Sequence, residues 1–61
     1  MWALLLVLMP GMLTPRMETP VPIPYDDCID MAVRVATYYA VKAKWERPIS
    51  ITCEVTDYDH Q

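Results

Sequence analysis

A chain of 61 residues with a net charge of −3 has room for one domain at most. This mild acidic excess excludes the basic face with which proteins bind nucleic acid, so we expect no nucleic-acid partner. Sixty-one residues also supply too few elements to wall the cleft of an enzyme, and we expect no catalytic residues, no metal and no cofactor.

The N-terminal segment is an apolar run with no charged side chain up to Leu13. Residues 2–9 are too few to cross a bilayer as a helix, which takes about 20 apolar residues, but their length is typical of a signal peptide. Pro10-Gly11 ends the run, although no Lys or Arg precedes it and no A-x-A-like site follows. We predict that residues 1–17 are a signal peptide or a hydrophobic anchor. The predicted location is secreted or periplasmic, with membrane anchoring as the alternative.

The next segment, residues 18–25, has proline at every second position from Pro20 to Pro24. Proline excludes a helix and holds the chain extended, which predicts a Pro-rich linker. The alternative is an edge strand, because alternating prolines remove N–H donors from one side only and leave those of the intervening residues on the other.

A helix is predicted to follow, with Asp26 or Asp27 as its N-cap, and to run from Cys28 to Trp45 without Gly or Pro. Its apolar residues recur at spacings of three and four and form one stripe, which consists of Cys28, Met31, Ala32, Val35, Ala36, Tyr39 and Ala43. Basic residues complement the carbonyl end, namely Lys42, Lys44 and Arg47. The aromatic residues of this region form either core and rim or a patch for a partner, and are Tyr38, Tyr39 and Trp45.

The following residues, 49–55, alternate between apolar and polar side chains, which predicts a half-buried strand. Cys53 lies on its apolar face, as Cys28 lies on the apolar stripe of the helix. The helix rises about 25 Å and the strand returns about 15–20 Å, so a turn between them can bring both cysteines to one level. We predict a Cys28–Cys53 disulfide, which would stabilise the chain by about 3–4 kcal/mol and fits an oxidising compartment. The alternatives are free buried thiols and a metal or catalytic role.

The C-terminal residues carry four possible metal ligands, which are Glu54, Asp57, Asp59 and His60. Their spacing does not match a calcium loop, and a single histidine with two distant cysteines makes half a zinc site at best. We interpret this end as a solvated terminus.

Together these elements predict a small α+β fold: an apolar leader (1–17), an extended Pro-rich linker (18–25), and one helix and one strand joined by a disulfide in a mini-domain (26–61). If residues 21–25 pair with 49–55, the unit is a minimal βαβ with parallel strands. If they do not, the strand has open edges and needs a partner.

The function we expect is that of an exported, disulfide-stapled protein-interaction module without enzymatic activity. It would bind an unknown protein partner, or itself, through residues 49–55, with Ser50 and Thr52 as candidates and the Thr52 amide as an edge donor. The first alternative is a small structural subunit of a membrane or a large assembly, with the leader retained. The second is a metal-binding or catalytic protein. A membrane contact would arise only through an uncleaved leader.

Overall fold

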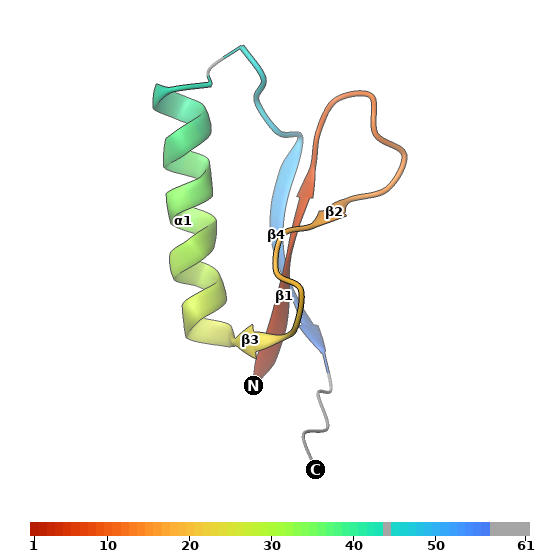
Figure 1. Cartoon of the computed structure of the whole chain (residues 1–61), viewed down its shortest axis with the longest axis vertical. Helices are drawn as coiled ribbons and strands as arrows, with labels where there is room; N and C mark the ends of the chain where they lie inside the picture. Colours follow the sequence, from red (N-terminus) through yellow and green to blue (C-terminus); the bar gives the residue numbers. More distant parts are fainter. Residues whose placement is uncertain (44, 57–61) are drawn as a thin grey trace.

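The apolar N-terminal run forms the central strand of a sheet in the computed structural model, which describes residues 1–43 and 45–56 (Figure 1). Strand β1, Trp2–Leu8, pairs antiparallel along its whole length with β4, Ser50–Thr56. When a strand has neighbours on both sides and a helix over one face, most of its side chains are buried. Its sequence is then a continuous apolar run. The segment predicted as a leader is therefore part of the sheet.

The signal-peptide interpretation of residues 1–17 stays a prediction, but it and this sheet exclude one another in a single molecule. Cleavage after residue 17 would remove β1, which is the strand that pairs with β4. A chain that keeps this sheet keeps its apolar N-terminal run.

Two short strands occupy the other edge of β1. β2, Arg16–Met17, pairs near the C-terminal end of β1, and β3, Ile23–Pro24, pairs near its N-terminal end, both antiparallel. Between them the buried hydroxyl of Thr19 accepts the N–H of Leu5 at 3.3 Å. A side chain thus continues the hydrogen-bond ladder along β1 where the proline-rich backbone no longer pairs with it.

The parallel βαβ arrangement is wrong. β3 pairs with β1 in antiparallel orientation, and β1 lies between β3 and β4. The physical reason is that the most apolar strand takes the central position, where both of its edges are covered. The strand near residues 49–55 consequently has one paired edge.

The Pro10-Gly11 pair forms a turn at the end of β1. The N–H of Met12 donates to the carbonyl of Met9 at 3.1 Å, and Gly11 has φ +89°. Proline followed by a residue with positive φ is the pattern of a type II turn, in which glycine is favoured because it lacks a Cβ.

The helix α1, Tyr25–Val41, begins directly after β3. Its N-cap is Pro24, and no side chain caps it, so the prediction that Asp26 or Asp27 is the N-cap is wrong. The reason is that the N–H of Tyr25 donates to the carbonyl of Met1 at 2.8 Å, so the strand runs into the helix without a capping turn. The two aspartates lie in the first turn, where negative charge stabilises the helix.

The helix also ends before Trp45, contrary to the prediction. Its 17 residues rise about 25 Å, and the seven residues of β4 span about 23 Å, so a longer helix would extend beyond the sheet. Lys42 is the C-cap residue, Arg47 lies in the connection to β4, and Lys44 lies outside the described residues.

The core lies between α1 and the sheet. Its fully buried apolar side chains are Ala3, Leu5, Val7 and Cys28. The predicted disulfide is confirmed: Cys28 in the first turns of α1 is bonded to Cys53 in β4, and their Cα atoms are 6.0 Å apart, which is an ordinary span. The predicted alternation of the last strand is confirmed in its middle, where Ile51 and Cys53 pack against the core. At its ends the prediction is wrong, because Ile49 and Val55 lie beyond the cover of the core and are 64% and 52% exposed. The α+β class and the disulfide are thus established.

Candidate functional site

The candidate surface is the outer edge of β4. β4 pairs with β1 on one side, and no other strand of the described residues pairs with its second side. The direction of the backbone groups follows from Leu5, whose N–H bonds Thr19 and whose carbonyl accepts the N–H of Glu18 at 2.8 Å. Both groups of Leu5 thus point away from β4, so the Leu5–Cys53 pair is one that exchanges no hydrogen bonds.

This alternation identifies the backbone groups on the outer edge. The N–H and C=O of Ile51, Cys53 and Val55 point away from β1, whereas those of Thr52 point toward β1. The Ile49 N–H donates to the carbonyl of Leu8 at 2.7 Å, so the outward donors begin at Ile51. The Thr52 amide is therefore not an edge donor, because it belongs to the ladder with β1.

The predicted contact residues Ser50 and Thr52 lie beside this edge, on the sheet face opposite α1. Their side chains are exposed and stand next to Leu8 and Leu6 of β1, their partners in the register. The sequence pattern identified these side chains correctly as polar and exposed. It did not identify the outward amides of the alternate residues, because alternation shows which side chains share a face and not which edge is paired.

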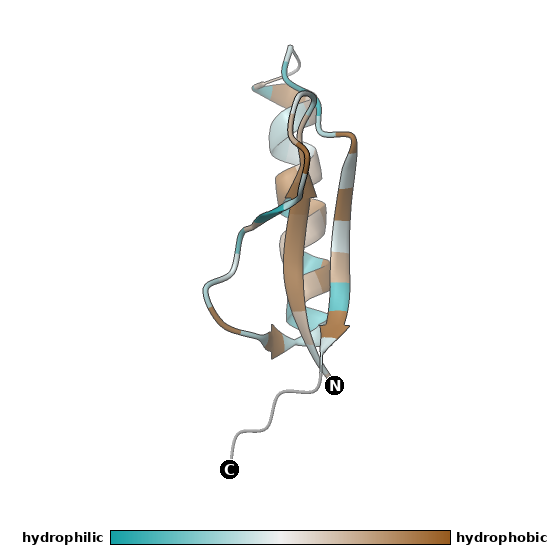
Figure 2. Cartoon of the chain, turned by 90° about the vertical axis from the view of Figure 1, so that its right-hand side faces the viewer, coloured by the Kyte–Doolittle hydropathy of each residue, from teal (hydrophilic) through white to brown (hydrophobic). Residues whose placement is uncertain are grey.

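The sheet face opposite α1 carries a second apolar surface. Alternate residues of β1 are half-buried there, namely Trp2, Leu4, Leu6 and Leu8. Figure 2 shows β1 as a continuous apolar band, with the mixed residues of β4 beside it. Met17 of β2 adds a side chain that is 52% exposed, and its position opposite Leu6 places it on the same face. This face extends the apolar surface next to the β4 edge.

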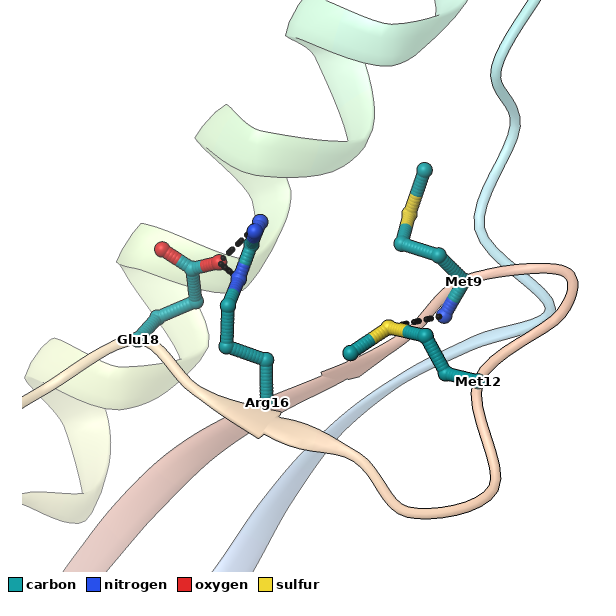
Figure 3. A network of polar contacts seen from close by, with 4 residues as sticks. All are labelled: Met9, Met12, Arg16 and Glu18. Carbon is teal, nitrogen blue, oxygen red and sulfur yellow. Dashed lines mark hydrogen bonds and ion pairs between the residues drawn. The ribbon is translucent and has the colours of Figure 1, made fainter.

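A charged hollow lies on the opposite side of the molecule from the β4 edge. The guanidinium of Arg16 donates from both Nε (3.0 Å) and Nη2 (2.9 Å) to Oε2 of Glu18 (Figure 3). The hydrogen bond and the charge of Glu18 raise the pKa of Arg16 above its ordinary value, with a smaller contribution from Tyr39. The hollow is shallow, and Arg34, Tyr38 and Tyr39 line it together with this pair.

Next to this hollow, the amide of Met9 donates to the sulfur of Met12 at 3.4 Å, which holds the turn after β1 together (Figure 3). The hollow itself lies between β2 and α1, and both of its arginines are paired, Arg16 with Glu18 and Arg34 with Asp30. We see in it no set of groups arranged for catalysis.

The aromatic candidates are divided between two places. The rings of Tyr38 and Tyr39 meet edge to face, with centroids 5.3 Å apart, on the α1 flank that faces β2. Trp45 lies beyond the helix and is 91% exposed. The three do not form one patch together with Ser50 and Thr52, because the tyrosines lie on the flank of α1 away from the β4 edge.

The possible metal ligands at the C-terminus mostly fall on residues that the structure does not describe, namely Asp57, Asp59 and His60. Within residues 1–43 and 45–56, no three His, Cys, Asp or Glu side chains gather closely enough to hold a metal ion. No helix in the same part of the chain is long and apolar enough to cross a membrane.

Comparison of the chain with protein-family models, with curated proteins and with solved structures gives no match. The β4 edge and the disulfide beside it are therefore the features from which a function can be proposed.

Proposed function

We propose that this chain is a protein-interaction module of an oxidising compartment, without enzymatic activity, which binds a partner by strand addition on β4. The observation that carries the proposal is the row of outward N–H and C=O groups of Ile51, Cys53 and Val55. An exposed row of this kind pairs readily with an extended segment of another chain.

The side chains of β4 support this proposal because they do little to prevent strand addition. Edges that avoid pairing carry proline, lysine or inward-pointing charge, whereas the only charged residue in β4 is Glu54. The polar side chains of Ser50 and Thr52 on one face can hydrogen-bond to an incoming strand, and Ile51 on the other face offers it an apolar neighbour.

The disulfide supports both the mode of binding and the compartment. It fixes Cys53, the middle outward residue of the edge, to the buried Cys28 of α1, so the edge is rigid before a partner arrives. A preorganised edge loses less conformational entropy on binding than a flexible one. A disulfide also fits an extracellular or otherwise oxidising compartment. We therefore also propose that the chain is exported.

The test uses the oxidised full-length chain and a displayed library of random, unconstrained peptides. A selected peptide that adds as a strand should slow hydrogen exchange at the amides of Ile51, Cys53 and Val55, measured by NMR. The amides of Thr52 and Glu54 should change little, because they are already bonded to β1. Slowing confined to the tyrosines of α1 or to the sheet face of β1 would contradict strand addition.

A pair of synthetic chains provides the matched control. Methylating the Cys53 amide nitrogen removes one outward donor from the β4 edge, whereas methylating the Met17 amide removes one from β2, at the opposite edge of the sheet. Met17 is paired with Leu6, whose backbone groups point to β4, so the Met17 N–H also points outward. Affinity for the selected peptide should fall about tenfold with the first change and stay unaltered with the second.

A second candidate function, a structural subunit that retains residues 1–17, is favoured by the position of β1. Its residues Ala3, Leu5 and Val7 make up most of the fully buried apolar core. In that case the sheet face of β1 opposite α1 would contact the assembly. The selected peptides would then slow hydrogen exchange in β1 and not at the outward amides of β4.

A further inference from the structure

We propose that the strand added to the β4 edge is β4 of a second copy, so that the chain forms a two-fold symmetric dimer with a continuous sheet. This inference rests on the proposed function, because it uses the same edge and names its occupant. Three features of the chain support the dimer: the hydrogen-bonding groups of the edge, the charges on both sides of it, and the flank of α1 that lies beside it.

The edge is self-complementary in its hydrogen-bonding groups. With the two-fold axis at Thr52, Ile51 lies opposite the partner subunit's Cys53, and Cys53 lies opposite the partner's Ile51. Both are residues whose N–H and C=O point outward, so each pair exchanges two hydrogen bonds. Beyond them, Val55 lies opposite the partner subunit's Ile49, whose N–H is already bonded to Leu8 in its own chain.

The same register also suits the charges and polar groups. Glu54 lies opposite the partner subunit's Ser50, which can donate a hydrogen bond to the carboxylate, and the two Glu54 carboxylates stay apart. Thr52 lies opposite the partner's Thr52, and a pair of threonines across two strands is favourable. A register with the axis at Glu54 would instead oppose two like charges, which is destabilising.

The flank of α1 beside this edge is apolar. Arg16 of β2 shares the charged hollow with Arg34, Tyr38 and Tyr39, so that flank of the helix faces β2. At about 100° per residue, the opposite flank, toward β4, consists of Ile29, Val33, Ala36 and Ala40. Ile29 is 42% exposed and Val33 is 59% exposed. Val33 lies at the outer margin of this flank, where it also borders a shallow hollow that Arg34, Tyr38 and Val41 line.

Pairing of the two β4 edges would bring these flanks together. Cys28 packs on the sheet with Ala3 and Leu5 of β1 and is bonded to Cys53 of β4, so α1 lies over both strands. With strands about 4.8 Å apart, two such helices would be separated by about 10 Å, which is an ordinary distance for packed helices. Measured along α1 toward its C-terminal end, Ile29 lies about 1.5 Å and Val33 about 7.5 Å beyond Cys28. In the same direction along β4, Thr52 lies about 3.3 Å beyond Cys53, which is bonded to Cys28. The axis therefore passes between Ile29 and Val33, so each faces the other in the antiparallel partner helix.

The size of the core gives a reason for such a dimer. The fully buried apolar side chains of the described residues are two large ones, Leu5 and Val7, and the smaller Ala3 and Cys28. Chains of this size commonly need a disulfide or an oligomer to supplement their core. A second copy buries Ile29 and Val33 and pairs the remaining backbone groups of β4 in one step, which a free peptide strand does not.

The first experiment is sedimentation equilibrium of the oxidised full-length chain from about 1 μM to about 1 mM, the range of weak association. We expect a reversible monomer–dimer equilibrium. Val33→Glu should raise its dissociation constant about a hundredfold, because a carboxylate would be desolvated between the helices. The matched control is Met31→Glu, which places the same charge at a residue that is 36% exposed and lies about 160° around α1 from Val33, on the flank toward β2. It should leave the dissociation constant unchanged.

The second experiment compares synthetic chains with a methylated amide at Ile51 and at Met17. The Ile51 change removes one intersubunit hydrogen bond on each side of the axis, so we expect the dimer to weaken about tenfold or more. The Met17 change should have no effect. Circular dichroism of each monomer checks that the fold is kept, so that weaker association can be assigned to the edge.

A chain that stays monomeric at about 1 mM, or a dimer that the Ile51 and Val33 changes leave intact, would overturn the dimer. These results are separable from failure of the proposed function. If the chain is monomeric but selected peptides protect its β4 amides, strand addition is supported and only the dimer is contradicted. If the chain is monomeric and no peptide protects its β4 amides, both the proposed function and the dimer are contradicted.

Discussion

At the scale of single residues, Thr19 has a role in the sheet that its place in a proline-rich segment does not suggest. It is 3% exposed, and its hydroxyl accepts the N–H of Leu5 at 3.3 Å. The prolines around it leave few backbone groups to pair with β1. A side-chain oxygen therefore takes the place of a strand carbonyl, and it prevents a buried N–H from remaining unpaired.

We expect Thr19→Val to lower the free energy of unfolding by about 1–3 kcal/mol, because the change keeps the shape but leaves the Leu5 N–H without its acceptor. Urea unfolding followed by circular dichroism measures the difference. Thr37→Val is the control, since the Thr37 hydroxyl is exposed and donates to the Val33 carbonyl within α1 at 2.9 Å. Equal stability of the two variants would show that the Thr19 hydroxyl does not support the sheet.

At the scale of elements, β1 determines the fold. It is the strand with which β2, β3 and β4 all pair, and its alternate residues supply most of the buried apolar surface. The helix covers one face of β1 and the disulfide ties the helix to β4. Without β1, the remaining strands have no common partner, so the elements of residues 26–56 would hold together mainly through the disulfide.

Leu5→Ala tests this dependence, because Leu5 is fully buried in the middle of β1. We expect the free energy of unfolding to fall by about 2–5 kcal/mol, as for other large-to-small substitutions in cores. Leu13→Ala provides the comparison within the same apolar segment, since Leu13 is 99% exposed, and the change should be within about 0.5 kcal/mol of zero. If both substitutions leave stability unchanged, residues 2–8 act outside the fold, as a leader would.

At the scale of the whole molecule, the disulfide closes a separation of 25 residues in the sequence and supplements a small core. Closing a loop of this length stabilises a chain by about 3–4 kcal/mol when the entropy of the unfolded state is considered. That amount is comparable to the stability that a core of this size supplies. The fold, the disulfide and the β4 edge therefore depend on one another.

The intact mass of the natively produced protein tests the sheet and the disulfide in one measurement. A molecule with this fold should retain residues 2–8 and should weigh two protons less than the reduced chain. Alkylation before reduction should add nothing, since no cysteine of the described fold is free. A mass that lacks the N-terminal residues would instead establish the cleaved leader, and β4 would then lose the partner strand seen here.

The sequence by itself determined the elements whose patterns are local. The alternation of residues 49–55, the stripe around Cys28 and the spacing of the two cysteines predicted a strand, a helix and their disulfide, and the structure has all three. The helix limits were less accurate, because the length of the sheet and the direct connection from β3 set them, and neither appears in the pattern of the helix.

Only the tertiary structure decided the place of residues 2–8 and the direction of the amides of β4. An apolar run of this length has the same composition as the core of a signal peptide and as a central strand, and what distinguishes them is whether other strands are there to pair with it. Likewise, the alternation of β4 specifies its faces but not its free edge. Which of its N–H groups point outward depends on β1 pairing with one side, and that pairing joins residues at opposite ends of the chain.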